Sequence, residues 1–503
     1  MSIEKENLSQ TAVKNSMYSI SVVLLSKIGG FVFTLMLARL LLPELFGLYS
    51  LALAVVMIAI AITDAGADLT GMRYISKALG ENDKGAARSY FRFLLKIKGL
   101  LILISIVIVL LIAKPLSNTV FNKPLFFLPL VFSCLYLIIE PIRSFFGVPF
   151  SAKKDLRILP PIELLFQSLK IILSLIAISI LSYKFKIPGI FAAFFISGFL
   201  SLSLVFIFLV KKDRELIFGK LVWIDKKKIL KYMGYMGLTS ITLIFFGSID
   251  ILMLGHFVEA EYLGYYKAAF VLVASISSLL PFSGILLPIF TQIQGERLDR
   301  GFKRSLRYLI ILAIPMSVGL IFISKYIILL FYGKEYLPAS TPLLVLSILI
   351  IISPLISLYS TIFQARDKIN LLVKFAIISL LMNIVLNYTL IKLLLNISPE
   401  YSIIGASIAT LASNAFFLSA LIIKTKSQFK IRLDNNIILK SIFATMMMSI
   451  FIFAFMKYVE IDILSGIVMI ISSAIIYFLI IFLVKGLGKE EISLFKFMLH
   501  RKS

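Results

Sequence analysis

Charged side chains in the middle of long apolar runs are the residues of this chain that could do chemistry. Lys27 and Lys170 each lie more than two turns from either end of such a run. An ammonium group near the centre of a bilayer costs about 2.5–3.5 kcal/mol on insertion scales, so it normally faces a cavity or a partner. As a point charge it attracts phosphate without fixing its orientation. We predict that both lysines line a cavity for an anionic ligand, with a structural ion pair between helices as the alternative.

Three further charged residues lie nearer the ends of apolar runs. Arg39 would either receive an anionic group at the outer face or extend to the interface as a snorkelling side chain. Lys267 would either contact the ligand or pair with Asp250 across a hairpin. Asp250 is also a candidate site for a coupling proton or cation.

Two acidic positions are predicted near the cytoplasmic ends of their runs. Asp64, with Asp68, would cap a helix or pair with Arg73 or another nearby cation, and ion coupling is the alternative. Glu140 stands beside Arg143, and we expect a local gate or salt bridge there.

The composition indicates what class of protein holds these charges. Of the 503 residues, 60% are hydrophobic and 15% are charged, against about 25% charged in an average soluble domain. The net charge of +25 must therefore be segregated from the apolar segments, as in an all-α polytopic membrane protein and unlike a nucleic-acid binder. One Cys and two distant His give no disulfide framework and no metal motif, and no phosphate-binding loop is present. We expect no cofactor, apart from coupling to H+ or Na+.

Apolar runs of about 20 residues, the length that crosses a bilayer, recur along the whole chain. We predict about fourteen membrane spans, or twelve if the last pair is misread, separated by short turn signals. The predicted spans are 14–38, 43–64, 92–113, 119–141, 158–182, 187–210, 229–255, 261–288, 305–331, 338–363, 370–395, 401–424, 437–457 and 462–485.

Lys and Arg are distributed unequally between alternate loops, and this bias predicts the orientation. Roughly 39 of the 51 fall at the termini and after even-numbered spans, and roughly 9 fall in the other loops. We expect a multi-pass protein of the cytoplasmic (plasma) membrane with both termini in the cytoplasm. The basic run of Lys226, Lys227 and Lys228 then serves topology and contact with anionic headgroups, so membrane lipids are expected partners.

The two halves of the chain share landmarks in the same order. Residues 44–49 (ELFGLY) parallel 261–266 (EYLGYY), and 83–88 parallel 299–304. Each half holds six spans, so the repeats are parallel, as in transporters with a central site between two bundles. The predicted domains are an N-terminal six-helix lobe at 1–213, a C-terminal six-helix lobe at 226–424, helices 13 and 14 at 435–486, and a cytoplasmic tail at 487–503.

Two prolines occupy equivalent places in the two repeats. Pro141 and Pro354 both interrupt apolar helices, where proline removes a backbone hydrogen bond and tends to kink the helix. They are hinge candidates, and static bends are the alternative.

The chain resembles a known transporter family at several motifs. Residues 26–31 (SKIGGF) and 38–49 (ARLLLPELFGLY) resemble the start of Wzx-type polysaccharide-biosynthesis flippases of the multidrug/oligosaccharidyl-lipid/polysaccharide exporter superfamily. Residues 328–336 (ILLFYGKEY) and 363–368 (FQARDK) resemble that family's signatures around its ninth to eleventh helices.

The resemblance implies a V-shaped pair of six-helix lobes around a cationic central cavity, and alternating access. It implies movement of a polyprenyl-(di)phosphate-linked oligosaccharide from the cytoplasmic to the outer leaflet for cell-surface polysaccharide assembly. Glycosyltransferases or a polymerase of the same pathway would be partners.

The first span also resembles that of the lipid II flippases, in which a basic residue matches Lys27. Those relatives carry an Arg-Asp pair further along the helix, whereas Phe33 and Thr34 stand at the matching positions here. This departure favours an oligosaccharide-lipid over a peptidoglycan precursor as the substrate.

Two other functions are alternatives. An ion-coupled drug or metabolite exporter of the same superfamily would be expected to use buried carboxylates rather than mid-membrane lysines. A membrane-embedded glycan polymerase or glycosyltransferase would need a carboxylate pair or a metal site, and usually a large outer loop. Because the sequence shows neither feature, we expect a transporter and not an enzyme.

Overall fold

The computed structural model describes residues 2–153, 155–280, 283–366, 368–429, 435–484 and 486. All regular secondary structure in these residues is helical, which confirms the predicted all-α class. The chain divides into two compact units, unit 1 (Met1–Lys267) and unit 2 (Ala268–Ser503). The six-helix lobes at 1–213 and 226–424 stay a prediction, and the tail at 487–503 lies outside the described residues.

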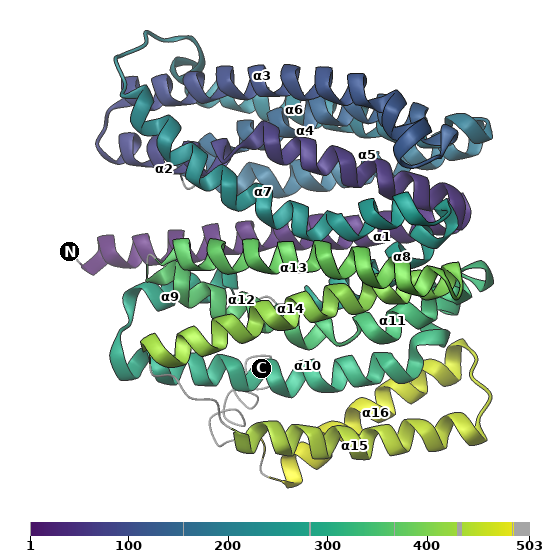
Figure 1. The fold of residues 1–503 in the computed structure, drawn as a ribbon. Coiled ribbons are helices and arrows are strands. Elements are labelled where there is room, and N and C mark those ends of the chain that lie inside the picture. The colour runs from purple at the N-terminus through teal and green to yellow at the C-terminus, as the bar shows by residue number, and fades with distance from the viewer. Residues whose placement is uncertain are drawn as a thin grey trace. The chain divides into compact units, whose positions relative to one another are not determined.

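Unit 1 is a bundle of long helices, in which α4 packs against α3 and α6 while α1 contacts α4, α5 and α7 (Figure 1). Its helices are α1 (Ser2–Asp64), α2 (Ala67–Gly80), α3 (Lys84–Pro115), α4 (Phe127–Ala152), α5 (Leu159–Ile180), α6 (Lys186–Phe218), α7 (Lys226–Phe257) and the first part of α8 (Ala260–Ser277). The short turns between them are η1 (Leu116–Val120), η2 (Pro124–Phe126), η3 (Leu156–Ile158) and η4 (Tyr183–Phe185).

The helix α1 contains a reversal of the chain. A straight helix of its 63 residues would be about 95 Å long, roughly three times the bilayer core. The break lies at Leu42, where φ is 61°. The ring centres of Phe33 and Phe194 are 5.3 Å apart, and those of Tyr49 and Phe191 are 5.9 Å apart. Since the two α6 residues are one turn apart, the α1 segments on either side of Leu42 must fold back on each other.

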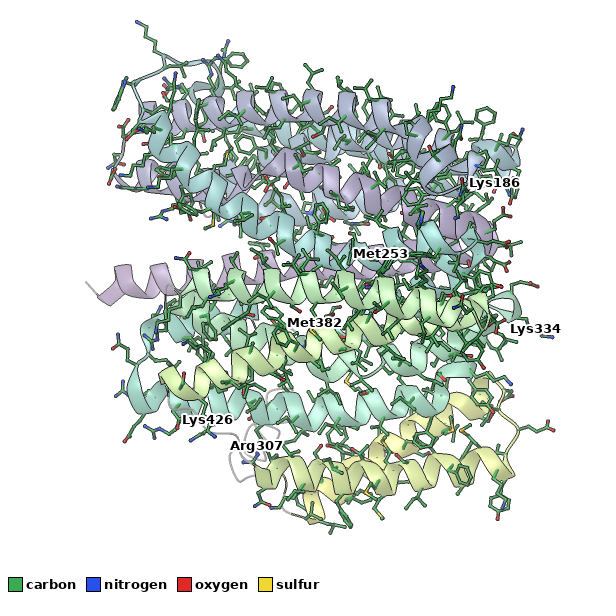
Figure 2. All side chains as sticks on the ribbon, viewed as in Figure 1. Lys186, Met253, Arg307, Lys334, Met382 and Lys426 are labelled. Carbon is green, nitrogen blue, oxygen red and sulfur yellow. The ribbon has the colours of Figure 1, made fainter. Side chains whose placement is uncertain are left out.

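Unit 2 is a second helical bundle, in which α10 contacts α11, α12 and α15, and α13 pairs with α14. In this unit Lys334 and Lys426 lie at opposite ends of the helices, with Met382 between them (Figure 2). Its helices are α9 (Ser283–Gln292), α10 (Gly295–Phe331), η5 (Lys334–Ala339), α11 (Ser340–Leu346), α12 (Leu349–Ala365), α13 (Ile369–Leu395), α14 (Pro399–Phe429), α15 (Asn435–Tyr458) and α16 (Ile463–Leu483).

The length and composition of these helices fit a multi-pass integral membrane protein. In the described residues 11 helical stretches qualify as membrane spans, or 12 if the bent pair from η5 to α12 is one span. The first stretch, Met17–Gly80, runs through the reversal and therefore carries the predicted spans 14–38 and 43–64 together. The predicted span 261–288 covers α8 and α9, which are not among the 11. With the bent pair counted as a twelfth span, these two differences account for the fourteen spans predicted from the sequence.

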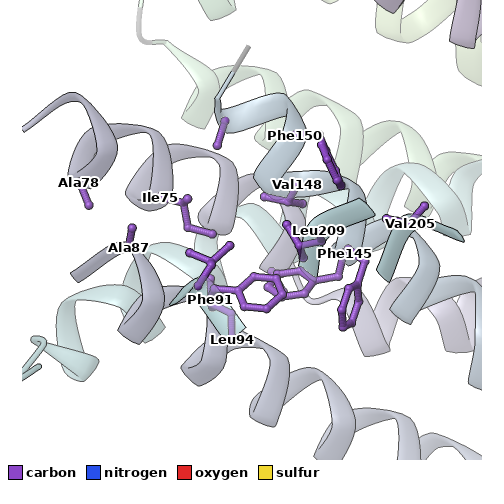
Figure 3. Close-up of a cluster of buried hydrophobic side chains, with 14 of the residues drawn as sticks. Ile75, Ala78, Ala87, Phe91, Leu94, Phe145, Val148, Phe150, Val205 and Leu209 are labelled. Atoms are coloured by element: carbon purple, nitrogen blue, oxygen red, sulfur yellow. The ribbon is translucent and has the colours of Figure 1, made fainter. Parts of the chain in front are cut away.

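An apolar cluster packs one end of unit 1, where α2, α3, α4 and α6 meet (Figure 3). The rings of Phe91 and Phe145 stack at its centre with 5.2 Å between their centroids. The ammonium group of Lys98 lies 5.3 Å from the centre of the Phe145 ring. The cluster therefore packs against Lys98, a buried charged residue of unit 1.

Candidate functional site

Polar side chains form a continuous chain between α4 and α5, here called the polar chain. Arg143 donates two hydrogen bonds of 2.9 Å to Glu140 and one of 3.2 Å to Glu163. Its guanidinium lies 4.1 Å from the centre of the Phe166 ring. The planar guanidinium, with five donors, can hold two carboxylates at once. The expected salt bridge at Glu140 is present, and it extends to a second helix. The members of the polar chain are Glu140, Arg143, Glu163, Gln167 and Lys170.

The polar chain ends at the predicted cation Lys170. Gln167 donates to Glu163 at 2.7 Å and accepts a hydrogen bond of 2.5 Å from the Lys170 ammonium. That ammonium is also 4.6 to 5.7 Å from the centres of three aromatic rings, and Lys170 is only 8% exposed. The rings belong to Phe33, Phe166 and Phe194. An amide oxygen and ring faces hold the cation directly, and among the described residues no carboxylate lies within ion-pair distance of it, although Glu163 acts on it from beyond Gln167.

The part of α1 that carries Lys27 passes along the same region of α5. A Cβ atom at Gly29 would lie 2.9 Å from the Cβ of Gln167, so the two helices are in close contact there. Lys27 itself is exposed, and among the described residues it has no hydrogen bond or ion pair. Arg39, on the same segment, is also exposed. The structure thus places Lys27 and Lys170 on neighbouring helices, and their role in binding stays a prediction.

A second charged group lies where α2 and α3 meet, and we call it the Lys98 triad of Asp64, Asp68 and Lys98. The Lys98 ammonium is 3.0 Å from the Asp64 carboxylate and also pairs with Asp68. Ser144 donates a hydrogen bond of 2.6 Å to Asp68. The side chain of Lys98 is 1% exposed. One buried cation on α3 therefore holds two carboxylates, from the end of α1 and from α2.

Asp64 also caps the start of α2. Its carboxylate accepts hydrogen bonds of 3.2 Å from the backbone amides of Gly66 and Asp68. Arg73, which the sequence offered as a partner of the two aspartates, lies over the ring of Tyr232 at 4.4 Å. The aspartates thus combine the expected cap with a cation from a different helix.

Asp250 is buried in α7, with 3% of its surface exposed. It accepts a hydrogen bond of 2.8 Å from the hydroxyl of Tyr266 on α8. Lys267, the next residue, is half-buried. The roles of Asp250 in ion coupling and of Lys267 in ligand binding stay predictions.

The duplicated motifs 44–49 and 261–266 lie against each other at one end of unit 1, in a contact that we call the glycine seam. A Cβ atom at Gly47 would overlap the carbonyl oxygen of Ala260, and one at Gly264 would overlap that of Pro43. The contact is reciprocal, because each glycine meets the residue four positions before the other. Only hydrogen fits at these two positions, so α1 and α8 approach to backbone contact.

A polar cavity of about 670 Å³ lies beside the glycine seam. Its charged and titratable lining residues are Glu44, Lys123, His256, Glu259 and Glu261. Lys123 donates hydrogen bonds of 2.7 and 3.0 Å to two backbone carbonyls. Burial lowers the pKa of Lys123 to about 8, although Glu259 acts in the opposite direction. Neither this cavity nor any other described part of the chain groups three His, Cys, Asp or Glu side chains that could hold a metal ion.

The two hinge candidates are buried inside helices. Pro141 lies within α4 and Pro354 within α12. Pro141 directly follows Glu140, so a change of bend in α4 would move the polar chain. Their function as hinges stays a prediction.

Sequence reasoning missed three residues of these groups. Glu163 and Gln167 precede Lys170 by seven and three positions, a spacing that puts all three on one face of a helix and could have identified them. Lys98 lies inside the predicted span 92–113, as Lys27 and Lys170 lie inside theirs. That position is the signal that could have identified it.

Comparisons with known proteins agree with this architecture. A model of the family described as "Polysaccharide biosynthesis protein" matches residues 12–294. The teichuronic acid biosynthesis protein TuaB of Bacillus subtilis (strain 168) is 27% identical over 128 residues. That match covers 25% of this chain, and the chain spans 26% of the length of this curated relative.

Solved structures share the fold over most of the chain. The lipid II flippase MurJ, in an inward closed conformation, matches with a TM-score of 0.73 and 17% identity over 92% of this chain and 97% of that chain. An inward-facing multidrug resistance MATE family transporter of the MOP superfamily matches with a TM-score of 0.63 and 16% identity over 80% and 96% of the two chains. At these identities the likeness establishes the fold and not the substrate.

Proposed function

Because the chain belongs to the polysaccharide biosynthesis protein family, we propose that it is a flippase for a polyprenyl-(di)phosphate-linked oligosaccharide. It moves this lipid from the cytoplasmic to the outer leaflet of the plasma membrane, with both termini in the cytoplasm. Family membership carries the proposal, and the fold shared with a lipid II flippase supports it. Glycosyltransferases or a polymerase of the same pathway supply and consume the substrate.

The phosphate groups of the substrate are attracted by Lys27 and Lys170. Lys27 is exposed and available for direct contact. Lys170 is held directly by Gln167 and aromatic rings, and Glu163 lies beyond Gln167 without an ion pair to it, so the ammonium can still attract an anion. Phe33, at the position where the lipid II flippases carry an Arg, is one of these rings. In this chain α1 therefore has a phenylalanine in place of that arginine, and its ring contacts the ammonium group of Lys170 on α5.

Alternating access supplies the transport step, and the glycine seam closes the outer end of unit 1. Leucine at Gly47 or Gly264 would force α1 and α8 apart, so either substitution should abolish flipping in protein that still reaches the membrane. Gly99→Leu is the matched control, because nothing lies within 4 Å of its added Cβ. Normal flipping by Gly47→Leu and Gly264→Leu would refute the closing role of the seam.

Coupling to H+ or Na+ accompanies the transport step, with Asp250, Asp64 and Glu140 as the acidic candidates. Proteoliposomes with an imposed pH or Na+ gradient test this directly. Flipping should accelerate with one of the two gradients in the wild-type protein and not in the variant of the residue responsible. A flipping rate that is the same with and without each gradient would show that transport is not coupled to H+ or Na+.

An ion-coupled drug or metabolite exporter is the second candidate, and the fold shared with a MATE transporter favours it. Such a protein would attract a cationic substrate with buried carboxylates. Here Glu140 and Glu163 already hold Arg143, and Asp64 and Asp68 hold Lys98. These resident cations favour the anionic lipid-linked substrate.

Deletion of the gene tests the proposed function in the cell. A strain without redundant flippases should accumulate a lipid-linked glycan on the cytoplasmic leaflet, and mass spectrometry of the lipid extract would identify it. Restoring Lys27→Ala or Lys170→Ala should leave most of the glycan on that leaflet while the protein inserts normally. Normal exposure of the glycan on the outer leaflet of the deletion strain would reject the proposal.

A further inference from the structure

The segment 215–225, which comprises the last turn of α6 and the loop to α7, is held in one conformation by α3. Arg88 and Arg92 donate hydrogen bonds to its backbone carbonyls, and the hydroxyl of Ser89 accepts one of 2.8 Å from a backbone amide. The backbone groups belong to Glu215, Ile217, Lys220 and Val222. Gly219 packs directly on the Arg88 guanidinium, and a Cβ atom at this position would displace that group from its backbone hydrogen bonds. The segment is therefore a fixed surface, drawn as the loop from α6 to α7 in Figure 1.

This fixed segment turns apolar side chains in two directions. Leu216 and Ile224 point into the core of unit 1 and are 5% and 8% exposed. Phe218, Leu221 and Trp223 point outward and are 62%, 52% and 88% exposed. Because the backbone is fixed, the outward apolar side chains are a stable feature of the surface, and grouped exposure of this kind marks an interaction site.

Exposed lysines accompany these apolar side chains. Lys220 lies among them, and three consecutive lysines begin α7. The neighbouring acid, Asp225, caps α7 by accepting a hydrogen bond of 3.1 Å from the amide of Lys228. We call this group the linker surface. Its members are Phe218, Lys220, Leu221, Trp223, Lys226, Lys227 and Lys228.

The two flanking helices keep the linker surface at a membrane face. Both α6 and α7 qualify as membrane spans, and only residues 219–225 separate them. A chain of that length reaches at most about 25 Å even when fully extended. Aromatic residues are favoured at the level of the headgroups, and lysines are attracted to anionic lipids.

We propose that the linker surface binds the headgroup region of the cytoplasmic leaflet, with Trp223 inserted at the interface and the lysines on anionic phospholipid headgroups. The complementary charge selects anionic phospholipids over zwitterionic ones. This binding anchors the connection between α6 and α7 to the membrane. It does not depend on the transported substrate.

The fluorescence of the full-length protein tests this proposal, because Trp223 is its single tryptophan. The protein is reconstituted in vesicles of phosphatidylcholine alone or mixed with phosphatidylglycerol, and each set includes lipids brominated near the headgroup. The bromolipids should quench Trp223 strongly, aqueous acrylamide should quench it weakly, and phosphatidylglycerol should increase the bromolipid quenching.

Charge variants separate headgroup binding from simple proximity to the bilayer. A triple variant with Lys226→Gln, Lys227→Gln and Lys228→Gln should lose at least about half of the increase caused by phosphatidylglycerol. The matched control, with Lys114→Gln, Lys184→Gln and Lys186→Gln at the opposite end of α3 and α6, should retain it. The proposal would be overturned if acrylamide quenched Trp223 strongly and bromolipid did not quench it. The linker surface would then be a binding site for a cytoplasmic protein. Quenching that is equal in both lipid mixtures would overturn its anionic selectivity.

Discussion

The two units differ in the kind of polar residue that they bury. In unit 1 the buried residues include five charged ones, which are Arg88, Lys98, Glu163, Lys170 and Asp250. In the described part of unit 2 the buried polar residues are serine, threonine and asparagine only. Burying a charge in a membrane bundle costs far more than burying a hydroxyl, so such a charge needs a partner or a functional role. In the described residues, the charged side chains that are buried therefore all lie in unit 1.

Unit 2 uses its buried polar groups to join helices. Between α13 and α14, Asn383 donates a hydrogen bond of 3.0 Å to the hydroxyl of Ser413. Ser379 donates to the Ser413 carbonyl at 2.6 Å, and within α13 Asn387 braces Asn383 by donating to its carbonyl at 3.0 Å. Hydrogen bonds of this kind between membrane helices contribute little individually. The described buried polar groups of unit 2 are thus uncharged and join or brace its own helices.

The largest expected effect is that of Arg143→Ala. It leaves two carboxylates without their cation, and breaking a buried ion pair costs about 3–5 kcal/mol. Unfolding can be followed by thiol labelling of Cys134, the single and buried cysteine. The variant should unfold at a much lower temperature than Arg157→Ala, a control at an exposed arginine. Equal stability of the two variants would show that the polar chain does not stabilise unit 1.

A smaller loss of about 3 kcal/mol is expected for Lys98→Met, because its aspartate partners are 22% and 25% exposed and keep part of their hydration. Adding Asp68→Asn should restore part of that stability, since one uncompensated carboxylate is removed. A double-mutant cycle by the same Cys134 labelling measures this coupling. Strictly additive losses would contradict the Lys98 triad as an interacting group.

Lys170→Met should separate stability from transport. No carboxylate loses a direct salt bridge, so the free energy of unfolding should fall by about 2 kcal/mol, the strength of a desolvated cation–π contact, and by less than in Lys98→Met. Flipping should fall at least about tenfold, because a charged hydrogen bond to phosphate contributes about 1.5–3 kcal/mol. Lys325→Met, at an exposed lysine of unit 2, is the control and should flip normally. If Lys170→Met unfolds easily but the folded molecules still flip the lipid at the wild-type rate, Lys170 stabilises the protein and is not needed for transport. That result would contradict the role assigned to Lys170.

The smallest effect is expected in unit 2. Asn383→Ala removes a neutral hydrogen bond between α13 and α14, and such bonds average about 0.6 kcal/mol in membrane bundles. Both the unfolding temperature and the flipping rate should stay close to those of the wild-type protein. A loss as large as that of Arg143→Ala would remove the distinction between the two units.

Local patterns in the sequence predicted much of the fold and only part of the site. The helical class and the reversal near Leu42 followed from apolar runs and a proline, which act through a few neighbouring residues. Lys170 could be predicted because a lysine in the middle of an apolar run is recognisable from that run alone. The partner of Asp64 and Asp68 was not, since Lys98 lies 30 and 34 positions away and tertiary packing alone joins them. The reciprocal contact of Gly47 and Gly264 also required the folded structure, although their repeated motif was visible in the sequence.

Reconstitution of the purified protein with its lipid-linked oligosaccharide tests the central claim most directly. Liposomes hold the lipid in both leaflets, and a glycan-modifying reagent added outside reaches only the outer one. The wild-type protein should make the inner-leaflet fraction accessible, whereas Lys27→Ala and Lys170→Met should do so slowly. The assignment of this chain as a flippase would be contradicted if correctly folded protein left the reagent-accessible fraction of the lipid at the value of protein-free liposomes.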